Sequence, residues 1–594
     1  MKFLLLAAAA FCVGAQAADL SPAHWPAGTR EKAEAREYQG WAPVAAQVRQ
    51  GSGGIISATV SPVAIEAGLQ TLRKGGNAAD AAASVALTQV ATQLGSVVSY
   101  AGIMTALYYD AKTGKVVSLD AGYATYKGET ASASIPQSDI SLLTGGPAPQ
   151  EKKDLGRQTL VPGFMAGMEA LEKRFGRLRF ADTLAPAIWY AENGVKVSPT
   201  LGFFFKTRQA QLSRTEEGKR FLEQAGNDLP QAGDVFRQRE LAATLKAVAR
   251  HGAQTMYTGA WAKTFVEFVR RDGGKVAAED LAAYRPEWSD AASTTVFAHT
   301  VYTNGGTSLA PYQLLTSLNA AEAMNLDKLG PYWSDAETFR ALNRLGEVVA
   351  GAPVLLPATE AALKAKGVDT SPAGQRTKAY AEALAAILPS LYAAHDADTH
   401  HSNALVVVDK NGNVAVVTHT INSVIWGDTG IVVGGIPIPD SAGFQQKRME
   451  TVAPGARLPN EIADTLVTDG KGRPVLASGC IGSSLLPETL RVIVSLVAQH
   501  QPLAATAAAP PLLININPKA YEMPFAQRPV IVPAGAYDAD LLGKLRADGT
   551  TVAEIPGLVV GSVRGTLALV AIDPDTGARS APEAPGVMVF SGTE

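Results

Sequence analysis

Two apolar, β-branched runs constrain the fold of this chain more than any other feature. Residues 404–408 and 414–421 are separated by a short polar segment, Asp409 to Asn413, that contains a glycine. Runs of this composition on either side of a short turn predict a β-hairpin that is buried on at least one face. Hydroxyl, imidazole and amide side chains flank the two runs, so the open end of the hairpin is the first place to look for a reactive site.

The turn residues set the register of this hairpin. Asp409 at the first position and Gly412 at the fourth favour a type I turn followed by a left-handed glycine, which pairs Asp409 with Asn413. Counting outward places Ser402 opposite Thr420. The two-residue period of a strand then puts four polar side chains on one face: Ser402, Thr418, Thr420 and Asn422. A two-residue primed turn at the same glycine would reverse the faces, but in the first register Ser402 is the leading candidate nucleophile.

Strand signals gather towards both ends of the chain, with helical periodicity between them. Residues 55–60 read as a strand and 105–119 as a hairpin, whereas 160–290 are mostly helical. The alanine-rich stretch 78–92 predicts a helix whose small side chains allow close packing in a core. The Ala-Pro-rich stretch 504–511 predicts a surface loop. The pattern favours an α/β (α+β) chain folded as one four-layer αββα sandwich.

The first 17 residues have the pattern of a secretory signal peptide. Lys2 supplies a charged start, residues 3–13 are apolar, and Ala15-Gln16-Ala17 is a small-residue cleavage motif. We therefore expect a mature chain from Ala18 that is exported across the inner membrane, most simply to the periplasm. No later run reaches about twenty apolar residues, so no membrane span is predicted.

Charge, cysteine content and motif spacing argue against several classes of protein. The formal net charge is −3, with 52 basic and 55 acidic residues, so the basic excess of nucleic-acid-binding proteins is absent. Cys480 alone remains after removal of the signal, which leaves no intrachain disulfide. His395, His400 and His401 complete no recognised zinc spacing, and no glycine-rich phosphate or dinucleotide motif occurs. The sequence predicts neither a metal nor a cofactor.

Motifs along nearly the whole mature chain resemble the γ-glutamyltransferase family of N-terminal-nucleophile hydrolases. The strongest match is Val407-Val408-Asp409-Lys410-Asn411-Gly412-Asn413 through Thr418-His419-Thr420-Ile421-Asn422 to Trp426-Gly427. Shorter matches precede it in the family's order: Gly75-Gly76-Asn77-Ala78-Ala79-Asp80-Ala81-Ala82, Val161-Pro162-Gly163 with Gly167, Leu241-Ala242-Ala243-Thr244-Leu245, and Gly273-Gly274 with Leu281-Ala282-Ala283-Tyr284. The resemblance implies the αββα fold of that superfamily.

In that family the precursor cuts itself, and a threonine exposed at the new N-terminus becomes the nucleophile. Alignment of residues 409–422 without gaps places Ser402 at this threonine, in agreement with the hairpin register. The resemblance thus implies cleavage between His401 and Ser402. The products would be a large chain of residues 18–401 and a small catalytic chain of residues 402–594, which stay associated in one αββα domain.

Thr399 is the alternative nucleophile. The run Thr399-His400-His401 imitates the Thr-Thr-His start of the family's small chain. Choosing it requires a three-residue insertion in the hairpin, which the ungapped match does not need. Ser402 is therefore preferred.

A hydroxyl at a new N-terminus has a base beside it. An α-amine with a pKa of roughly 7.7 to 8.0 can take the proton of the hydroxyl without a histidine. The resemblance implies that Thr420 and Asn422 orient the nucleophile and the amine of Ser402. It also implies that the backbone amides of Gly482 and Ser483 form the oxyanion hole.

The substrate pocket departs from the family pattern. Family members hold the substrate carboxylate with an arginine after an Asp-Phe pair, whereas Gly122 stands at that place here. A bidentate guanidinium is hard to replace, so its loss weakens the case for a glutamyl donor. Asn460 and Glu461 replace the family's paired serines, which makes Asn460 a candidate substrate contact. Asp440 matches the family's aspartate and is expected to bind a substrate amine.

Three functions are compatible with the sequence. The first is an autoprocessing γ-glutamyltransferase-like enzyme, active in glutathione hydrolysis or γ-glutamyl transfer to water, amino acids or peptides through an acyl-enzyme on Ser402. The second is an acylase of the same fold acting on a non-glutamyl amide. The third is an uncleaved exported protein that binds a small ligand without catalysis, which the replaced pocket residues motivate.

His419 and Cys480 lie near the predicted site but have simpler interpretations. His419 alternates with Thr418 and Thr420, so it faces away from them and is expected to be packed or hydrogen-bonded. A lone cysteine such as Cys480 more often acts as a small hydrophobic side chain than as a nucleophile.

Overall fold

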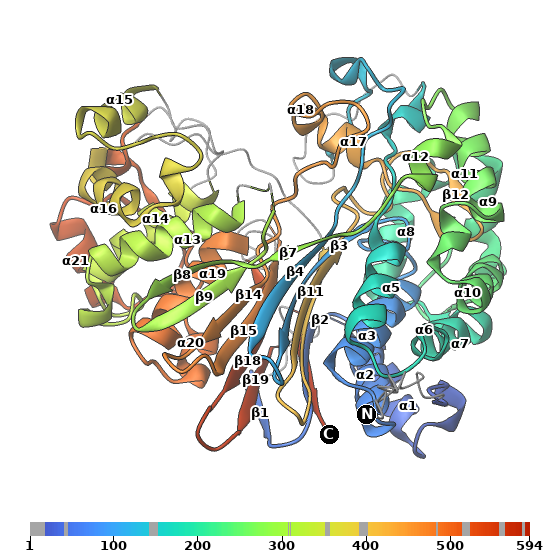
Figure 1. Cartoon of the computed structure of the whole chain (residues 1–594), viewed down its shortest axis with the longest axis horizontal. Helices are drawn as coiled ribbons and strands as arrows, with labels where there is room; N and C mark the ends of the chain where they lie inside the picture. The colour runs from blue at the N-terminus through green and yellow to red at the C-terminus, as the bar shows by residue number, and fades with distance from the viewer. Residues whose placement is uncertain are drawn as a thin grey trace, which may run out of the picture.

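Two antiparallel sheets lie face to face at the centre of the molecule (Figure 1). The computed structural model describes residues 18–40, 46–141, 153–306, 308, 310–350, 357–390, 402–482, 485–513, 523–557, 565–584 and 588–594, and in these residues each of the two sheets has seven strands. The first sheet has the order β1 (Gln47–Gly51), β19 (Arg579–Glu583), β18 (Thr566–Ile572), β15 (Pro474–Ile481), β14 (Thr465–Thr468), β9 (His299–Thr303), β8 (Ala292–Val296). The second has the order β20 (Val589–Thr593), β2 (Ile55–Thr59), β10 (Ser402–Val408), β11 (Val414–Thr420), β3 (Ile103–Asp110), β4 (Lys115–Ala121), β7 (Glu287–Asp290).

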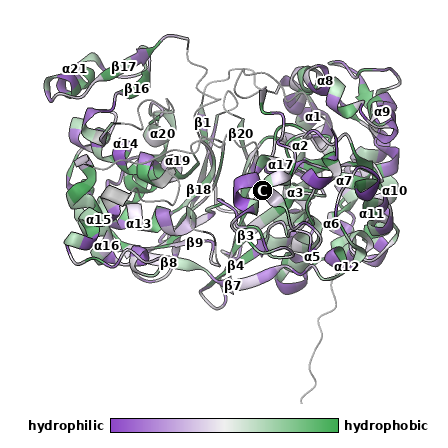
Figure 2. Cartoon of the chain, turned by 90° about the horizontal axis from the view of Figure 1, so that it is seen from above, coloured by the Kyte–Doolittle hydropathy of each residue, from purple (hydrophilic) through white to green (hydrophobic). Residues whose placement is uncertain are grey.

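Helices cover the outer face of each sheet, and the layers are visible from above (Figure 2). The main helices on the side of the second sheet are α1 (Thr29–Gln39), α2 (Pro62–Arg73), α3 (Ala78–Thr92), α5 (Phe164–Phe175), α7 (Ala185–Asn193), α8 (Pro199–Leu212), α10 (Arg239–His251) and α11 (Ala260–Arg271). Those on the side of the first sheet are α13 (Ala310–Ala323), α14 (Ala336–Ala350), α15 (Pro357–Ala365), α16 (Lys378–Ile387), α19 (Leu485–Ile493), α20 (Leu503–Ala508) and α21 (Ala539–Ala547). The predicted αββα sandwich is confirmed.

Several predictions fall outside the described residues. They concern the signal peptide 1–17, the alternative nucleophile Thr399, the cleavage-site residue His401 and the oxyanion residue Ser483. Within the described parts of the chain, every helix is too short or too polar to cross a membrane.

Apolar side chains fill the spaces between the layers. Along β10, Leu405 and Val407 belong to the core under the helices, whereas Val406 and Val408 belong to the core between the two sheets. This is the two-residue period of a strand that is buried on both faces. Every residue of β10 and β11 is buried, so the hairpin lies at the centre of the molecule.

The alanine-rich segment forms α3, and all 15 of its residues are buried. A capping box closes its start, because the Asn77 side chain accepts from the Asp80 amide while the Asp80 carboxylate accepts from the Asn77 amide at 2.8 Å. Gly68 on α2 allows the two helices to pack closely, since a Cβ atom there would lie 2.5 Å from Val85. Small side chains therefore bring α3 against the hairpin strands.

The central hairpin has the register that the turn residues predict. Ser402 pairs with Thr420, and Ala404 pairs with Thr418. The hydroxyl-bearing residues at its open end therefore share the face that looks towards the first sheet.

The turn of the hairpin is closed by one carboxylate. The Asp409 amide donates to the Asn413 carbonyl at 3.1 Å, and Gly412 has a φ of +85°, where glycine is favoured. The Asp409 carboxylate accepts from the amides of Asn411 at 2.8 Å, Asn413 at 3.1 Å and Ala78 at 3.0 Å. The last bond joins the turn to the start of α3.

Both sheets combine strands from before and after residue 402. In the second sheet β2 lies between β20 and β10, and β3 pairs with β11. In the first sheet β1 pairs with β19, and β9 pairs with β14. Neither sheet is therefore complete without strands from both sides of residue 402.

The predicted surface loop at 504–511 is wrong over most of its length. Residues Leu503–Ala508 form the helix α20, and Thr506 is buried. Alanine has the highest helix propensity, and the prolines on either side, Pro502 and Pro510, bound the helix without interrupting it.

Candidate active site

The open end of the hairpin gathers three predicted site residues. Ser402 is the first residue of β10, lies opposite Thr420 and is 8 % exposed. The Asn422 amide donates to Oγ1 of Thr420 at 2.9 Å. Asn422 has a φ of +44°, a left-handed conformation that asparagine adopts more readily than most residues. The backbone thus turns sharply after β11 and keeps Asn422 beside the Ser402–Thr420 pair.

The loop after β11 is tied down at Ile421. The Ile421 carbonyl accepts from the Tyr123 hydroxyl at 3.1 Å and from the Ser441 hydroxyl at 2.6 Å. Two residues after Ile421, the Ser423 hydroxyl donates to the Asp440 carboxylate. These bonds bring Asp440 to the same end of the hairpin as the three residues above.

Asp440 is fully buried, and one of its carboxylate oxygens has no partner in the part of the chain that the structure describes. Oδ1 accepts from Ser423, whereas Oδ2 has no hydrogen-bond partner among the described residues. Burial, and next repulsion by Asp428, raise the pKa of Asp440 to about 6, while hydrogen bonds and Arg208 act in the opposite direction. A buried carboxylate with a free oxygen suits an ammonium group on a ligand.

A buried ion pair supports the loop that carries Asp440. Arg208 bonds to Asp428 at 2.6 Å and to the Gly427 carbonyl at 2.8 Å. Gly427 has a φ of +73°, and a Cβ atom there would lie 2.4 Å from Oδ1 of Asp440. The loop can therefore approach the carboxylate only because residue 427 is glycine.

The position of the missing arginine is crowded. A Cβ atom on Gly122 would lie 2.9 Å from Oδ1 of Asp120, and 3.5 Å from both Cδ of Arg457 and Nδ2 of Asn460. The Gly122 amide donates to the same Asp120 oxygen at 2.6 Å. Burial raises the pKa of Asp120, and Arg457 opposes that shift. The fold thus brings Asn460 to Gly122 but leaves little room for a long side chain at residue 122.

Arg457 forms a hydrogen bond with the backbone that follows β4. Its guanidinium lies over the Tyr284 ring, 4.5 Å from the centroid, and donates to the Gly122 carbonyl and the Tyr284 hydroxyl. The same guanidinium donates to the Arg285 carbonyl at 2.6 Å. These contacts join segments more than 150 residues apart, and no local sequence pattern indicates them.

The first sheet contributes two further predicted residues. Asn460 precedes β14, and its Oδ1 accepts from the Ile462 amide at 3.1 Å. Gly482 directly follows β15 and has a φ of +92°, a conformation that glycine adopts readily. Three residues earlier, Gly479 lies so close to the hairpin that a Cβ atom would be 3.1 Å from the Ala404 side chain.

Asp464 is a buried carboxyl group that no sequence motif marks. Its Oδ1 accepts from the Thr418 hydroxyl at 2.6 Å, and its Oδ2 accepts from Thr105 at 2.7 Å and from Asn304 at 3.3 Å. Burial raises the pKa of Asp464 to about 7, although these hydrogen bonds lower it. The one sequence feature that could have indicated Asp464 is its position directly before the apolar run 465–467.

His419 faces the helices, and the expectation of a packed, hydrogen-bonded residue is confirmed. Its Nε2 lies 2.8 Å from Oε1 of Gln89, and its ring centroid is 5.2 Å from that of Phe164. Burial lowers the pKa of His419 to about 3, so the ring is neutral at ordinary pH. The cross-strand neighbour Asn403 is also buried, and neither of its side-chain polar atoms has a partner among the described residues.

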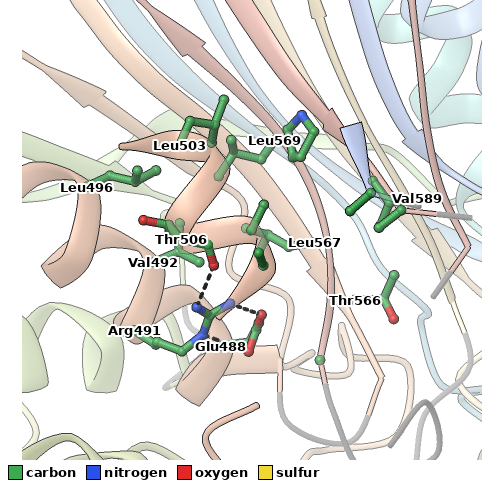
Figure 3. Close-up of a pocket in the computed structure, with 16 residues that line it drawn as sticks. Glu488, Arg491, Val492, Leu496, Leu503, Thr506, Thr566, Leu567, Leu569 and Val589 are labelled. Atoms are coloured by element: carbon green, nitrogen blue, oxygen red, sulfur yellow. Dashed lines mark hydrogen bonds and ion pairs between the residues drawn. The ribbon is translucent and has the colours of Figure 1, made fainter. Parts of the chain in front are cut away.

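A cavity of about 370 Å³ lies on the opposite face of the first sheet from the hairpin (Figure 3). Leu567 and Leu569 of β18 line it and pack with the helices, while alternate residues of that strand face the core between the sheets. Within the cavity Arg491 pairs with Glu488 and donates to the Thr506 carbonyl at 3.1 Å. We assign this cavity no part in the chemistry. Among the described residues, no cluster of three or more His, Cys, Asp or Glu side chains is placed to hold a metal ion.

Comparisons with known proteins agree with one another. The family model described as gamma-glutamyltranspeptidase matches residues 64–575. The glutathione hydrolase proenzyme of Pseudomonas aeruginosa is 27 % identical over 476 residues, which cover 76 % of this chain and 81 % of that protein. The acylase ACY 1 proenzyme of Pseudomonas sp. strain V22 is 27 % identical over 477 residues, which cover 77 % of this chain and 82 % of that protein.

A solved structure has the same layered architecture. Cephalosporin acylase from Bacillus halodurans aligns with a TM-score of 0.72 and 22 % identity, over 93 % of this chain and 97 % of that one. This likeness supports the αββα fold independently of the sequence matches.

Proposed function

Because the chain belongs to the gamma-glutamyltranspeptidase family, it is an N-terminal-nucleophile amide hydrolase or acyltransferase, and we propose that Ser402 is its nucleophile. One observation carries the proposal: Ser402, Thr420 and Asn422 meet at the open end of a buried hairpin. The Asp440 oxygen that has no partner among the described residues lies in the loop tied to the same end. A nucleophile beside a carboxylate that can bind an ammonium group suits an amide substrate with a free amine.

Self-cleavage is proposed between His401 and Ser402. The Ser402 hydroxyl attacks the carbonyl carbon of His401, the peptide C–N bond breaks as the ester bond to Oγ forms, and the nitrogen takes up a proton as the new α-amine. Water then hydrolyses the ester and regenerates the hydroxyl. The products are a large chain of residues 18–401 and a small chain of residues 402–594, which remain together as one domain. The proenzyme names of two relatives support this step.

The same hydroxyl then performs the amide chemistry. The α-amine of Ser402 takes the hydroxyl proton as Oγ attacks the substrate carbonyl, and it gives a proton to the departing amine, which leaves an acyl ester on Ser402. Thr420 and Asn422 orient the hydroxyl and the amine, and the amides of Gly482 and Ser483 stabilise the oxyanion. Water or a second amine releases the acyl group.

The proposed substrate is a small amide or peptide, with its free amine on Asp440 and Asn460 as a further contact. A γ-glutamyl amide such as glutathione is the first candidate, since a relative is a glutathione hydrolase proenzyme. The crowding around Gly122 favours a second candidate, an acylase for amides without an α-carboxylate, because no arginine occupies that position. The acylase relative supports this alternative.

Export is part of the proposal. The signal pattern of residues 1–17 supports passage of the chain across the inner membrane, with the periplasm as the destination. Cell fractionation with detection of the mature N-terminus at Ala18 tests it. A chain that keeps Met1 and stays in the cytoplasm would contradict it.

Intact mass measurement and N-terminal sequencing test the nucleophile. Wild type is expected to yield two chains, the smaller beginning at Ser402, whereas Ser402→Ala stays as one chain and Thr399→Ala is cut normally. A small chain that begins at Thr399 would move the nucleophile three residues upstream. A folded wild-type chain that is uncut and still binds a small ligand would favour the non-catalytic binding protein.

Two chromogenic substrates test the acyl group. A γ-glutamyl anilide and an N-acyl anilide without an α-carboxylate carry the same leaving group, so their kcat/KM ratio reports acyl preference alone. Hydrolysis of the γ-glutamyl compound supports the first candidate. Hydrolysis of only the second compound would establish the acylase.

A further inference from the structure

The carboxyl group of Asp464 joins the two sheets next to the proposed active site. Asp464 lies directly before β14 of the first sheet, and its amide donates to Oδ1 of Asn304, which follows β9 of the same sheet, at 2.7 Å. Its two oxygens accept from Thr418 of β11 and Thr105 of β3, both in the second sheet. Oδ2 also accepts from the Asn304 side-chain amide at 3.3 Å, so this one side chain bonds to groups from both sheets.

The two threonines place this contact one step from the nucleophile. Thr418 and Thr105 are directly opposite each other on neighbouring strands, and Thr418 is also opposite Ala404. Ser402 and Thr420 form the next pair on the same face of the hairpin, two residues further along each strand. A change in the position of Thr418 is thus transmitted to Thr420 through one intervening residue of the same strand.

In the described parts of the chain, no cation pairs with the Asp464 carboxyl group. Its bonded partners are two hydroxyls and one amide. The same row of the second sheet continues on β4 to Asp120, which faces Arg457 and the Gly122 amide instead. The neighbouring ring of His419 lies on the opposite face of β11. An uncompensated buried acid is costly for folding, so its presence here calls for a role besides stability.

We propose that Asp464 is a positioning residue, whose carboxylate holds Thr418 and through it fixes the Ser402–Thr420 end of the hairpin for attack. The inference rests on the proposed function of Ser402. The ionised carboxylate accepts from both threonine hydroxyls at once. A protonated carboxyl group carries a hydrogen that it must donate. One of the three hydrogen bonds then has to exchange donor and acceptor or break. Full activity therefore needs Asp464 ionised and the α-amine of Ser402 neutral.

The pH dependence of kcat/KM tests this requirement. With a donor whose amine is acetylated, so that the charge of Asp440 is not needed, we expect the acid limb of log kcat/KM for wild type to approach a slope of two, since two groups must lose protons. Asp464→Asn keeps the shape but cannot ionise, so we expect about tenfold lower kcat/KM at pH 8 and an acid limb with a slope of one. Asp409→Asn is the matched control, because it changes a buried carboxylate at the other end of the same hairpin and should keep the wild-type slope.

Each outcome decides the matter. A slope of two in Asp464→Asn, or an equal change in Asp409→Asn, would overturn the positioning role. A folded Asp464→Asn chain that is not cut, while Asp409→Asn is cut, supports it. An uncut and inactive wild-type chain would overturn the proposed function itself. This result is seen in wild type alone, so it cannot be confused with a failure of the positioning role, which appears only when the variants are compared.

A stability measurement locates the titration without using activity. In a Ser402→Ala background, which stays as one chain, the melting temperature is compared with and without Asp464→Asn between pH 4 and pH 8. The pKa of Asp464 is raised in the folded state, so its contribution to stability is complete below about pH 4 and is lost as the pH rises towards 7. The melting temperature of the Asp464→Asn chain should therefore rise relative to that of the chain with Asp464 as the pH increases from about 4 to 7. A constant difference would show that Asp464 does not titrate there and would overturn the proposal.

Discussion

The two ends of the central hairpin are equally buried but differ in how their polar groups are satisfied. At the turn, the Asp409 carboxylate accepts only backbone and side-chain amides, and these bonds connect the turn to α3. At the open end, Asn403 and Asp440 leave polar atoms without partners among the described residues. Two buried acids near that end, Asp440 and Asp464, have raised pKa values. The turn end resembles an ordinary structural network, whereas the open end retains buried polar atoms without partners among the described residues.

This difference separates stability from activity along a single hairpin. A fully bonded polar group stabilises the fold, and an unpartnered one destabilises it by about 1 to 3 kcal/mol. Substitutions at the turn should therefore change the free energy of unfolding with little effect on the rate. Substitutions at the open end should do the reverse.

Thr420→Val is expected to have the largest effect. The valine keeps the shape but removes the hydroxyl that accepts from the Asn422 amide, so the reacting groups lose their alignment. We expect kcat to fall on the order of 10²- to 10³-fold with a small change in melting temperature. Steady-state kinetics on the cut enzyme and calorimetry measure the two quantities. If Thr420→Val lost activity only because part of the protein was unfolded, the proposed difference between the two ends of the hairpin would be contradicted.

Asp409→Ala should produce the opposite result. The change leaves the amides of Ala78, Asn411 and Asn413 without their acceptor in a buried place. We expect a loss of about 3 kcal/mol in the free energy of unfolding, measured by urea denaturation of the uncut Ser402→Ala chain. In the active background, kcat/KM of the folded fraction should stay within about twofold of wild type.

Asp440→Asn is expected to affect substrates selectively. The amide keeps a bond to Ser423 but removes the charge that attracts an ammonium group. We expect kcat/KM to fall about 10- to 50-fold for a donor with a free amine, which is a typical loss for one charge-assisted hydrogen bond. A donor that carries an acetylated amine serves as the control and should lose less than threefold. Equal losses for both donors would remove Asp440 from the substrate site.

His419→Gln gives the smallest effect and concerns acid stability. The pKa of His419 is lowered in the folded state, so its contribution is present above about pH 6.5 and is lost as the pH falls, because the unfolded chain binds the proton more readily. Wild type should lose about 1 to 2 kcal/mol more than His419→Gln between pH 6.5 and pH 5. Urea unfolding at several pH values measures this difference. The exposed His251→Gln serves as a control and should follow wild type.

Local chemistry made the hairpin and α3 predictable from sequence. Asp409 and Gly412 fix the turn within a few residues, and that turn determines which residue stands opposite Ser402. The boundaries of α3 follow from its cap at Asn77 and its alanine content. Short-range rules were sufficient for these elements.

Contacts between distant segments were not predictable in the same way. Asp464 binds threonines on two strands of the other sheet, and Arg457 reaches a carbonyl 335 residues earlier in the chain. Arg457 carries no local pattern that distinguishes it from a surface charge, and the only signal at Asp464 is its place directly before the apolar run 465–467. The helix at Leu503–Ala508 was missed because flanking prolines were interpreted as loop signals, although they only bound the helix. The site roles of Ser402 and Asp440 stay predictions that the proposed variants test.

Because each sheet contains strands from before and after residue 402, we expect unfolding of the cut protein to be harder to reverse than unfolding of the precursor. The uncut precursor folds as a single molecule, so its refolding rate does not depend on concentration. Once cut at the proposed site before Ser402, the protein would consist of two fragments, and neither would carry all the strands of a sheet. Recovery from denaturation would then require an encounter between two separate unfolded chains, in competition with their aggregation. We therefore expect the rate of unfolding to set the working lifetime of the cut enzyme, because two separate fragments reassemble much less readily than one whole chain folds.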